Sequence, residues 1–384
     1  MRWPSVALAD VLRPSTDRVT LAPDTRYKQV TARLWGKGLT LRGEVTGAEI
    51  AASQQNQVRT GQFVVSKIDA RHGAFGVVPP ELNGAVVSND FPVFDVRSDV
   101  AVTAYIAWVS RTDWFIALCK RASEGSTNRV RLKQARFLAQ RIPVPPLTEQ
   151  WRIVARLDAA AAAMEARIIA AGELEAELAA TLAVAFDQII RDAPRSTMGE
   201  VAPLVRRSIT INPEAEYAEI GVRSFYRGIF ARRVLKGEDF SWQKLFRVDE
   251  GDLVFSNLMA WEQAVALAGP EHAGTVGNHR MLTCEVVRSK ALPEFLAYYF
   301  QTDAGFHEII RASPGTMARN KTLSTKLLPG ITVPVPSLAA QHWFDRLQAK
   351  VRAARVAQAA ATAELDALLP ALLHDAFGDA DARD

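Results

Sequence analysis

Two segments of the chain carry a long helical pattern of apolar positions. In the first, residues 148–190, apolar side chains recur every three or four residues, with one break at Glu175 and no proline. This heptad pattern predicts an α-helix that buries one stripe against a partner helix. A straight helix of that length would run for about 65 Å, too long for an ordinary core helix. The predicted seam consists of Val154, Leu157, Ala161, Met164, Ile168, Ala171, Leu178, Leu182, Ala185 and Ile189.

The second segment repeats the first near the end of the chain. A proline-rich lead-in, IPVPPLTEQ in the first copy and VPVPSLAAQ in the second, aligns Gln150 with Gln341. Thr148 is a plausible N-cap for the first helix. Pro370 lies inside the second pattern and is expected to kink the helix or to end it. The second seam consists of Leu347, Val351, Ala354, Gln358, Ala361, Leu365, Leu368 and Leu372.

The stretches before each helix also repeat. RTGQFVVSKI matches DEGDLVFSNL, and RASEGSTNR matches RASPGTMAR, so the chain is one unit written twice. We therefore expect an α+β fold, with two repeated mixed α/β domains separated by two long antiparallel coiled-coil helices and related by a pseudo-two-fold axis. The expected parts are domain 1 at 1–147, the first spacer helix at 148–192, domain 2 at 193–338, and the second spacer helix with a C-terminal tail at 339–384.

Within each domain the pattern predicts a few longer elements. Period-two or continuous apolar runs predict strands at 62–68 and 85–96, and an amphipathic run predicts a helix at 103–122. The matching pieces of the second domain are 252–258, 275–287 and 294–313. Each helical run is followed by a polar loop with cations, at 124–133 and 314–326.

Composition and charge narrow the class of protein. The 384 residues carry a net charge of +4, with Lys and Arg in excess in both domains and Asp and Glu in excess in both helical segments. Basic domains on an acidic frame favour a polyanionic partner. There is no run of 18 apolar residues and no secretory pattern at the start, and the two cysteines are isolated. We expect a cytoplasmic protein with no membrane contact.

Polar and basic side chains gather at three places in each domain, typically where a strand pattern ends. Donors and acceptors at such tips could read base edges, and cations could bind phosphates; solvated loops are the ordinary alternative for any single residue. The candidate DNA contacts of domain 1 are Ser66, Lys67, Arg71 and His72, then Asn89, then Thr127, Asn128, Arg129, Arg131 and Lys133. Those of domain 2 are Asn257 and Trp261, then Asn278, His279 and Arg280, then Arg319, Asn320 and Lys321.

With these motifs in view, the chain resembles the specificity subunit of type I restriction–modification systems. The resemblance rests on the proline-rich strand running into EQWRIVARLD, on SKIDARHGAFGVVP and SNDFPVF, and on RASEGSTNRVRL, and it spans essentially the whole chain. It implies that 1–147 and 193–338 are target-recognition domains. It also implies a subunit that reads a split target in double-stranded DNA and bridges two methyltransferase subunits and restriction motor subunits. It also implies that S-adenosylmethionine, ATP and Mg²⁺ belong to those partners, with no cofactor or metal in this chain.

Catalytic signatures are missing from the sequence. There is no G-x-x-x-x-G-K-[ST] loop, no Asn/Asp-Pro-Pro-aromatic tetrapeptide of the adenine methyltransferases and no nuclease carboxylate cluster. We therefore expect a non-catalytic subunit and no catalytic residues, which disfavours a self-sufficient methyltransferase. Two alternatives remain: the specificity subunit of a related type II restriction–modification enzyme, and a coiled-coil scaffold that binds proteins rather than DNA.

Overall fold

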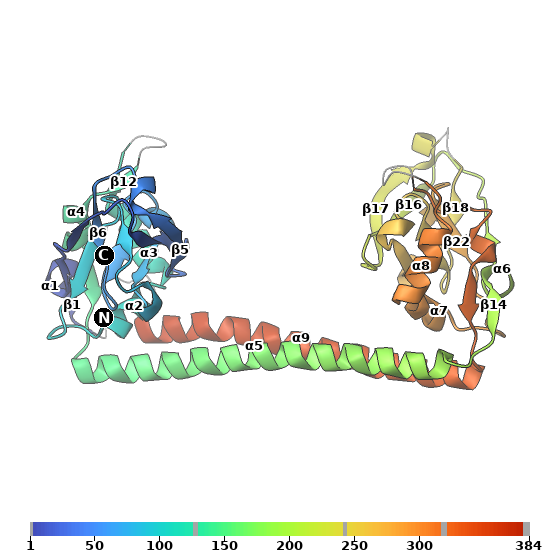
Figure 1. Cartoon of the computed structure of the whole chain (residues 1–384). Coiled ribbons are helices and arrows are strands. Elements are labelled where there is room, and N and C mark those ends of the chain that lie inside the picture. The colour runs from blue at the N-terminus through green and yellow to red at the C-terminus, as the bar shows by residue number, and fades with distance from the viewer. Residues whose placement is uncertain (1–2, 126–129, 241–243, 316–320, 379–384) are drawn as a thin grey trace. The chain divides into compact units, whose positions relative to one another are not determined.

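The computed structural model describes residues 3–125, 130–240, 244–315 and 321–378 (Figure 1). The chain divides into two compact units, and the division cuts both long helices. Unit 1 comprises residues 1–171 and 359–384, and unit 2 comprises residues 172–358. Each unit therefore contains one globular domain, half of the helix that follows it and half of the other helix.

The domain of unit 1 is built on two small sheets. A four-stranded sheet has the order β2-β10-β7-β8 and a five-stranded sheet the order β3-β6-β9-β4-β5. The short pair β1–β13 brings the two ends of the domain together. The strands are β1 Ser5–Ala7, β2 Leu12–Pro14, β3 Arg18–Thr20, β4 Arg26–Ala32, β5 Leu39–Thr46, β6 Gln54–Gln57, β7 Phe63–Val65, β8 Phe75–Val77, β9 Val86–Val87, β10 Val93–Val96, β11 Ser123–Glu124, β12 Arg131–Leu132 and β13 Arg141–Pro143.

Helices complete the core of the first domain. They are α1 Leu8–Val11, α2 Thr103–Val109, α3 Asp113–Arg121 and α4 Gln134–Ala139, with short 3-10 turns including η2 at Ala70–His72. Phe63 and Phe75 of the four-stranded sheet pack against Phe115 of α3, with ring centroids 6.0 and 5.1 Å from it. All three rings are fully buried, so apolar burial holds the sheet to the helical layer.

The domain of unit 2 has a similar topology, but its second sheet has four strands where domain 1 has five. Its four-stranded sheet has the order β15-β22-β19-β20, and a second sheet has the order β17-β16-β21-β18. The elements are β14 Arg195–Thr197, α6 Met198–Val201, β15 Leu204–Val205, β16 Glu216–Val222, β17 Ile229–Lys236, β18 Phe246–Arg247, β19 Leu253–Ser256, η6 Ala260–Glu262, β20 Val265–Leu267, β21 Val276–Gly277, β22 Met281–Cys284, α7 Pro293–Tyr299, α8 Asp303–Arg311 and β23 Thr332–Pro334. The predicted fold class, a mixed α/β domain and a long helix written twice, is confirmed.

Two long helices account for the periodic segments. Helix α5 is Leu147–Ile190 and α9 is Leu338–Phe377. In unit 2 they run antiparallel, since Phe186 packs on Phe344 at 5.2 Å between ring centroids while Glu175 accepts two hydrogen bonds from Arg355. Helix α9 continues for seven residues beyond Pro370, so the expectation that this proline might end the helix is wrong. The reason is packing, because Leu372, Leu373, Ala376 and Phe377 lie against the core of unit 1.

Several expectations about element bounds and seams need correction. Residues 85–96 form two strands in different sheets, β9 and β10, with a turn at Ser88–Asp90 between them, and residues 103–122 form two helices because Thr112 caps α3. The second domain breaks at the same places. Two seam positions are exposed: Ile168, which lies in the middle of α5 away from the domain core, and Leu368, whose neighbour Leu369 packs on the core of unit 1 instead.

A buried glutamine joins each domain to the start of its helix. Gln150 accepts a hydrogen bond from the Val102 amide at 2.8 Å and donates to the carbonyls of Val100 and Pro145 at 3.0 and 2.8 Å. Gln341 makes the same three bonds, accepting from the Leu292 amide at 2.8 Å and donating to Lys290 and Pro336 at 3.2 and 2.8 Å. Both glutamine side chains are fully buried, so each amide satisfies backbone groups at the junction between the domain and its helix.

The opposite end of the other helix contributes an aromatic anchor to each unit. In unit 1 the Phe377 ring of α9 meets Tyr105 at 5.6 Å between centroids, and in unit 2 the Phe186 ring of α5 meets Phe295 at 5.2 Å. By length and composition alone, α9 is the one helix among the described residues that could cross a membrane. Because it places Phe344 and Phe377 in the two cores, we assign it to packing within the protein.

Replacing the buried glutamines should loosen the domains from their helices. Gln150→Leu and Gln341→Leu each leave an amide and two carbonyls buried without partners, so each should lower the free energy of unfolding by about 3 kcal/mol. Urea denaturation measures this. Gln188→Leu makes the same chemical change at an exposed site of α5 and should stay within about 0.5 kcal/mol of the parent. Equal stability of all three variants would contradict the assignment.

Candidate nucleic-acid interface

The three predicted clusters of domain 1 meet at the end of β7. The Lys67 amide donates to the Asp90 carbonyl at 2.8 Å, and the Lys67 carbonyl accepts from the Leu132 amide at 2.7 Å. Side chains reinforce this crossing: Lys67 Nζ donates to the Asn89 carbonyl at 2.9 Å, and the Arg131 guanidinium donates to Asp90 Oδ1 at 2.9 Å. Segments that lie far apart in the sequence therefore lie side by side at this crossing, which includes β12 (Figure 1).

Domain 2 repeats the crossing with different side chains. The Asn257 amide donates to the Arg280 carbonyl at 2.7 Å, and the Asn257 carbonyl accepts from the Leu323 amide at 2.8 Å. Asn257 Nδ2 also donates to the Leu323 carbonyl at 2.7 Å. The backbone arrangement is thus constant between the domains, while Lys67 is exchanged for Asn257 and Asn89 for His279.

Most of the predicted contact residues that the structure describes retain solvent access. Asn89, Arg131, Lys133, His279 and Arg280 are exposed, and Lys67, Arg71, His72, Asn257, Trp261, Asn278 and Lys321 are partly exposed. Thr127, Asn128, Arg129, Arg319 and Asn320 lie outside the described residues.

Two members of the predicted set support turns. Ser66 is 3% exposed, and its hydroxyl accepts a hydrogen bond from the Asp69 amide at 3.2 Å. Trp261 is half-buried, and its indole N–H donates to the Leu258 carbonyl at 2.7 Å. These groups shape the loop between β7 and β8, or between β19 and β20, and Ser66 has little surface to offer a ligand.

A buried carboxylate orients one cluster of domain 2. Glu219 of β16 is fully buried and accepts from Arg233 Nε at 2.7 Å, Arg232 Nη1 at 3.3 Å and Asn278 Nδ2 at 2.9 Å. Asn278 Oδ1 in turn accepts from the Arg280 amide at 2.9 Å. The network links β16 and β17 to residues 278–280. The side chain of Asn278 is therefore already used in hydrogen bonds within the protein.

Cations outside the predicted set also border the clusters. Arg18 donates to Asn89 Oδ1 at 3.1 Å, and Arg206 donates to the carbonyls of His279 and Met281 at 3.0 and 3.1 Å. Burial lowers the pKa of Arg206 from its ordinary value. Comparing the two repeats does not reveal these two arginines, because neither has a cation at the equivalent position of the other repeat. Thr16 is equivalent to Arg206, and Ser208 is equivalent to Arg18.

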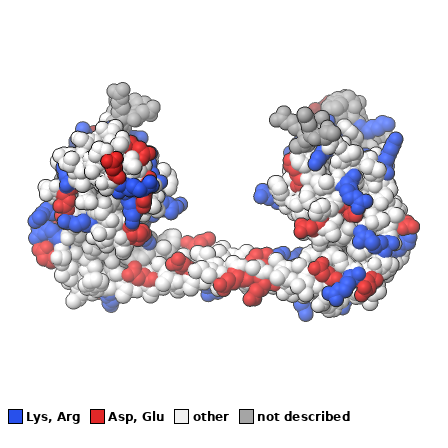
Figure 2. Space-filling view, viewed as in Figure 1, with Lys and Arg blue, Asp and Glu red and all other residues white. Residues whose placement is uncertain are grey.

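Charge is distributed as the sequence predicts. Figure 2 shows blue patches over both globular domains, whereas the helical part carries red patches. Glu173, Glu175 and Glu177 are exposed on α5. A polyanion would therefore favour the domains over the helices.

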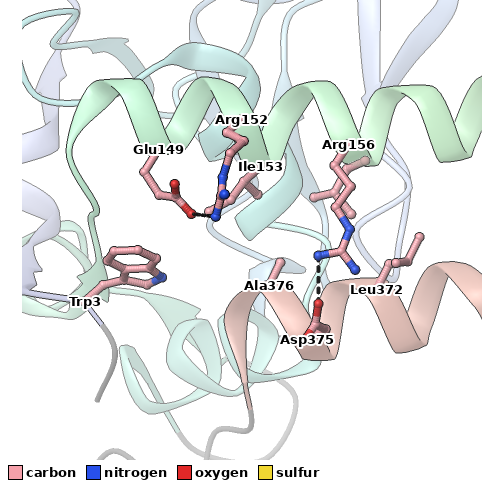
Figure 3. Close-up of a pocket in the computed structure, with 9 residues that line it drawn as sticks. Trp3, Glu149, Arg152, Ile153, Arg156, Leu372, Asp375 and Ala376 are labelled. Carbon is pink, nitrogen blue, oxygen red and sulfur yellow. Dashed lines mark hydrogen bonds and ion pairs between the residues drawn. The ribbon is translucent and has the colours of Figure 1, made fainter.

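A groove at the helix end of unit 1 has a different character. It has a volume of about 240 Å³ and is bounded by Trp3, the first turns of α5 and the last turns of α9 (Figure 3). Its cations are paired inside the groove, Arg152 with Glu149 and Arg156 with Asp375, both at 2.8 Å. These pairs leave little net charge for a phosphate, so we do not include the groove in the candidate interface.

The described residues offer little for metal binding or thiol chemistry. They contain no group of three or more His, Cys, Asp or Glu residues that could hold a metal ion. Burial raises the pKa of the Cys284 thiol to about 12, and burial likewise raises the pKa of Cys119 above the normal range. A thiol kept protonated in this way is a poor nucleophile or metal ligand.

Comparisons with known proteins identify a domain match and similar folds. Residues 3–173 match the family model described as the type I restriction modification DNA specificity domain. No curated protein matches the chain. Among solved structures, the HsdS subunit from Thermoanaerobacter tengcongensis is 20% identical with a TM-score of 0.63, and the match covers 98% of this chain and 97% of that one.

A second solved structure gives the same result. It is described as the structural basis of complex assembly and conformational transition of the type I R-M system, and it matches at 20% identity with a TM-score of 0.68, covering 98% of this chain and 97% of that chain. Likeness at this identity shows the fold. The family match adds that residues 3–173 resemble the type I restriction modification DNA specificity domain.

Proposed function

We propose that this chain is the DNA-reading subunit of a type I restriction–modification complex, in which each domain contacts one half of a split target. The observation that carries the proposal is the repeated backbone crossing, Lys67 with Asp90 and Leu132 in one domain and Asn257 with Arg280 and Leu323 in the other. A constant frame that presents different side chains suits two readers with different sequences.

The remaining parts of the complex follow from the family. Double-stranded DNA, two methyltransferase subunits and restriction motor subunits are the proposed partners, in the cytoplasm. The chain itself is proposed to be non-catalytic, with S-adenosylmethionine, ATP and Mg²⁺ bound by the partner subunits. The two thiols with raised pKa values support this division, because neither is suited to nucleophilic chemistry.

Mapping modified adenines tests the proposal most directly. We expect a split motif to be methylated in DNA from cells that carry the gene and to be unmethylated after its deletion. The mapped motif then supplies the cognate duplex for binding assays. A methylation pattern that is identical with and without the gene would contradict a DNA-reading role, and would favour a scaffold.

The exposed cations of the clusters should contribute separately to salt dependence. Arg131→Ala and Lys321→Ala should each weaken binding to the cognate duplex. If the cation contacts a phosphate, the slope of log K against log salt should fall by about one with sequence preference unchanged. If it contacts a base, preference at one position should relax by about 1–3 kcal/mol.

Two controls make this test specific. Arg167→Ala removes an exposed cation from α5, outside the clusters, and should leave binding unchanged. Asp90→Asn removes the carboxylate that pairs with Arg131 at 2.9 Å but keeps the arginine. It therefore distinguishes the effect of losing the cation from the effect of breaking its ion pair with Asp90. If Arg131→Ala and Lys321→Ala bind the cognate duplex like the parent, the clusters are ordinary solvated loops.

The helices are proposed to set the length of the unread gap. Adding seven residues after Ala171 and seven after Gln358 preserves the heptad and lengthens each helix by about 10.5 Å. We expect the gap in the methylated motif to grow by about three base pairs at 3.4 Å each, while both half-sites stay the same. A folded insertion variant that methylates the original motif with undiminished preference would show that the helices do not set the gap.

A further inference from the structure

Each domain ends one hairpin in an exposed aromatic residue that no packing explains. Trp35, between β4 and β5, is 62% exposed, and Phe225, between β16 and β17, is 63% exposed. The two positions are equivalent under the repeat offset of 190. Single exposed apolar residues are common, but a large aromatic at the same tip of both domains calls for a common cause.

Both aromatics sit on strained backbone. Trp35 has φ 62° and Phe225 has φ 60°, in the left-handed region that bulky side chains rarely occupy. Such a conformation costs free energy and persists only where the surroundings impose it, which is most often at functional sites.

A pair of backbone hydrogen bonds imposes it here. The Trp35 amide donates to the His72 carbonyl at 2.7 Å, and the Gly36 amide donates to the Gly73 carbonyl at 3.0 Å. The two loop segments approach so closely that a Cβ on Gly73 would lie 2.6 Å from the Gly36 nitrogen. The tip is therefore fixed directly against the Arg71–His72 part of the candidate interface, and the Trp35 ring meets the His72 ring edge-on at 6.3 Å.

Domain 2 keeps this clamp although the glycines are gone. The Phe225 amide donates to the Glu262 carbonyl at 2.9 Å, and the Tyr226 amide donates to Gln263 at 3.0 Å. Tyr226 and Gln263 hold φ values of 54° and 65° where domain 1 has glycines, and the Tyr226 hydroxyl donates to the Phe300 carbonyl at 2.5 Å. Domain 2 thus keeps the same backbone conformation with non-glycine residues, for which positive φ angles cost more free energy. This indicates that the position of the aromatic residue is important.

Cations flank both aromatics at the same spacing. Arg33 and Lys37 lie two residues before and after Trp35, and Arg223 and Arg227 flank Phe225 in the same way; all four are exposed. The Arg227 guanidinium lies 5.8 Å from the centre of the Phe225 ring. An exposed aromatic between two cations suits a polyanion with stacked bases, whereas the centre of a protein–protein interface is depleted of lysine.

We propose that Trp35 and Phe225 are wedges that insert at a base step of the duplex, with Arg33 and Lys37, or Arg223 and Arg227, binding the phosphates on either side. This inference rests on the proposed function and adds a mode of contact to it. Clamping the tip before binding lowers the conformational entropy lost on insertion. Unstacking at the step would couple recognition to the deformability of the sequence as well as to its base edges.

The test uses the full-length chain and a labelled duplex bearing the mapped methylation motif. Trp35→Ala and Phe225→Ala should each weaken binding about 5- to 150-fold without changing the salt slope, because an apolar contact releases no counterion. Arg33→Ala should instead lower the slope by about one. Thymines at the wedged step should react with permanganate in the parent complex and lose that reactivity with Trp35→Ala.

Matched variants separate the wedge from effects on folding. Trp35→Phe should retain most of the affinity, and Trp35→Gly, which suits the left-handed backbone, should behave like Trp35→Ala. Leu41→Ala and Val234→Ala remove exposed apolar side chains from strands of the same two hairpins, 49% and 59% exposed, and should change nothing.

Each outcome bears on the proposal. Unchanged affinity of Trp35→Ala and Phe225→Ala overturns the wedge and leaves the DNA-reading function standing. Unchanged DNA affinity with lost assembly of methyltransferase subunits also overturns it and assigns the tips to a protein partner. A parent chain that shows no salt-dependent preference for the mapped duplex overturns the proposed function, and the wedge with it.

Discussion

The junction between each reading domain and its long helix depends on one buried amide. Gln150 and Gln341 each satisfy one carbonyl of the proline-rich lead-in. Each also satisfies one backbone N–H and one carbonyl of the segment before α2 or α7. Proline cannot donate a ladder hydrogen bond, so a chain that approaches a helix through Pro-Val-Pro needs side chains to complete its hydrogen bonding. With the amide in place, the direction in which the helix leaves the domain is fixed by hydrogen bonds and not by apolar contact alone.

A rigid junction and rigid loops keep the surface side chains in fixed positions. A loop residue can report on a base only if its backbone is held within a fraction of an ångström of a fixed place. The crossing at Lys67 and Asn257 does this for three segments at once, and the clamp under Trp35 and Phe225 does it for the hairpin tip. Domain 2 uses Glu219 for a further constraint, where domain 1 has Gln29. The frame is conserved between the repeats while its means of support differ.

How far the sequence predicts this fold depends on the range of the interactions involved. The helices and the repeat were predictable because heptads and matching phrases are local signals. The break of 85–96 into two strands is harder to predict, because the polar run Ser88–Asp90 suits a turn but does not show that the two halves join different sheets. Near the end of α9, Leu369 packs on the core of unit 1 whereas Leu368, the heptad position, is exposed. The contact with that core, and not the heptad, therefore determines which leucine is buried.

The candidate site shows the same limit. Cation clusters at matching loops were predictable as sets, but the placement of Ser66 inside a turn required the structure. The aromatic tips were overlooked although a signal was present, namely RLWGKG in one repeat and RSFYRG in the other. Apolar residues next to strand patterns ordinarily belong to a core, and only positive φ angles and high exposure distinguish these two.

The middle of the helices differs physically from their ends. Ile168, Ile169 and Val356 are 58%, 56% and 70% exposed, and the polar contact there between Glu175 and Arg355 is itself partly exposed. An exposed ion pair contributes little to stability. Most of the apolar burial of α5 and α9 lies at their ends, through Leu157 and Phe377 in one unit and Phe186 and Phe344 in the other. The length of the middle can therefore change at small cost to the folding of either domain. Under the proposed function, this would let the spacing of the two half-sites and the reading of their bases vary independently.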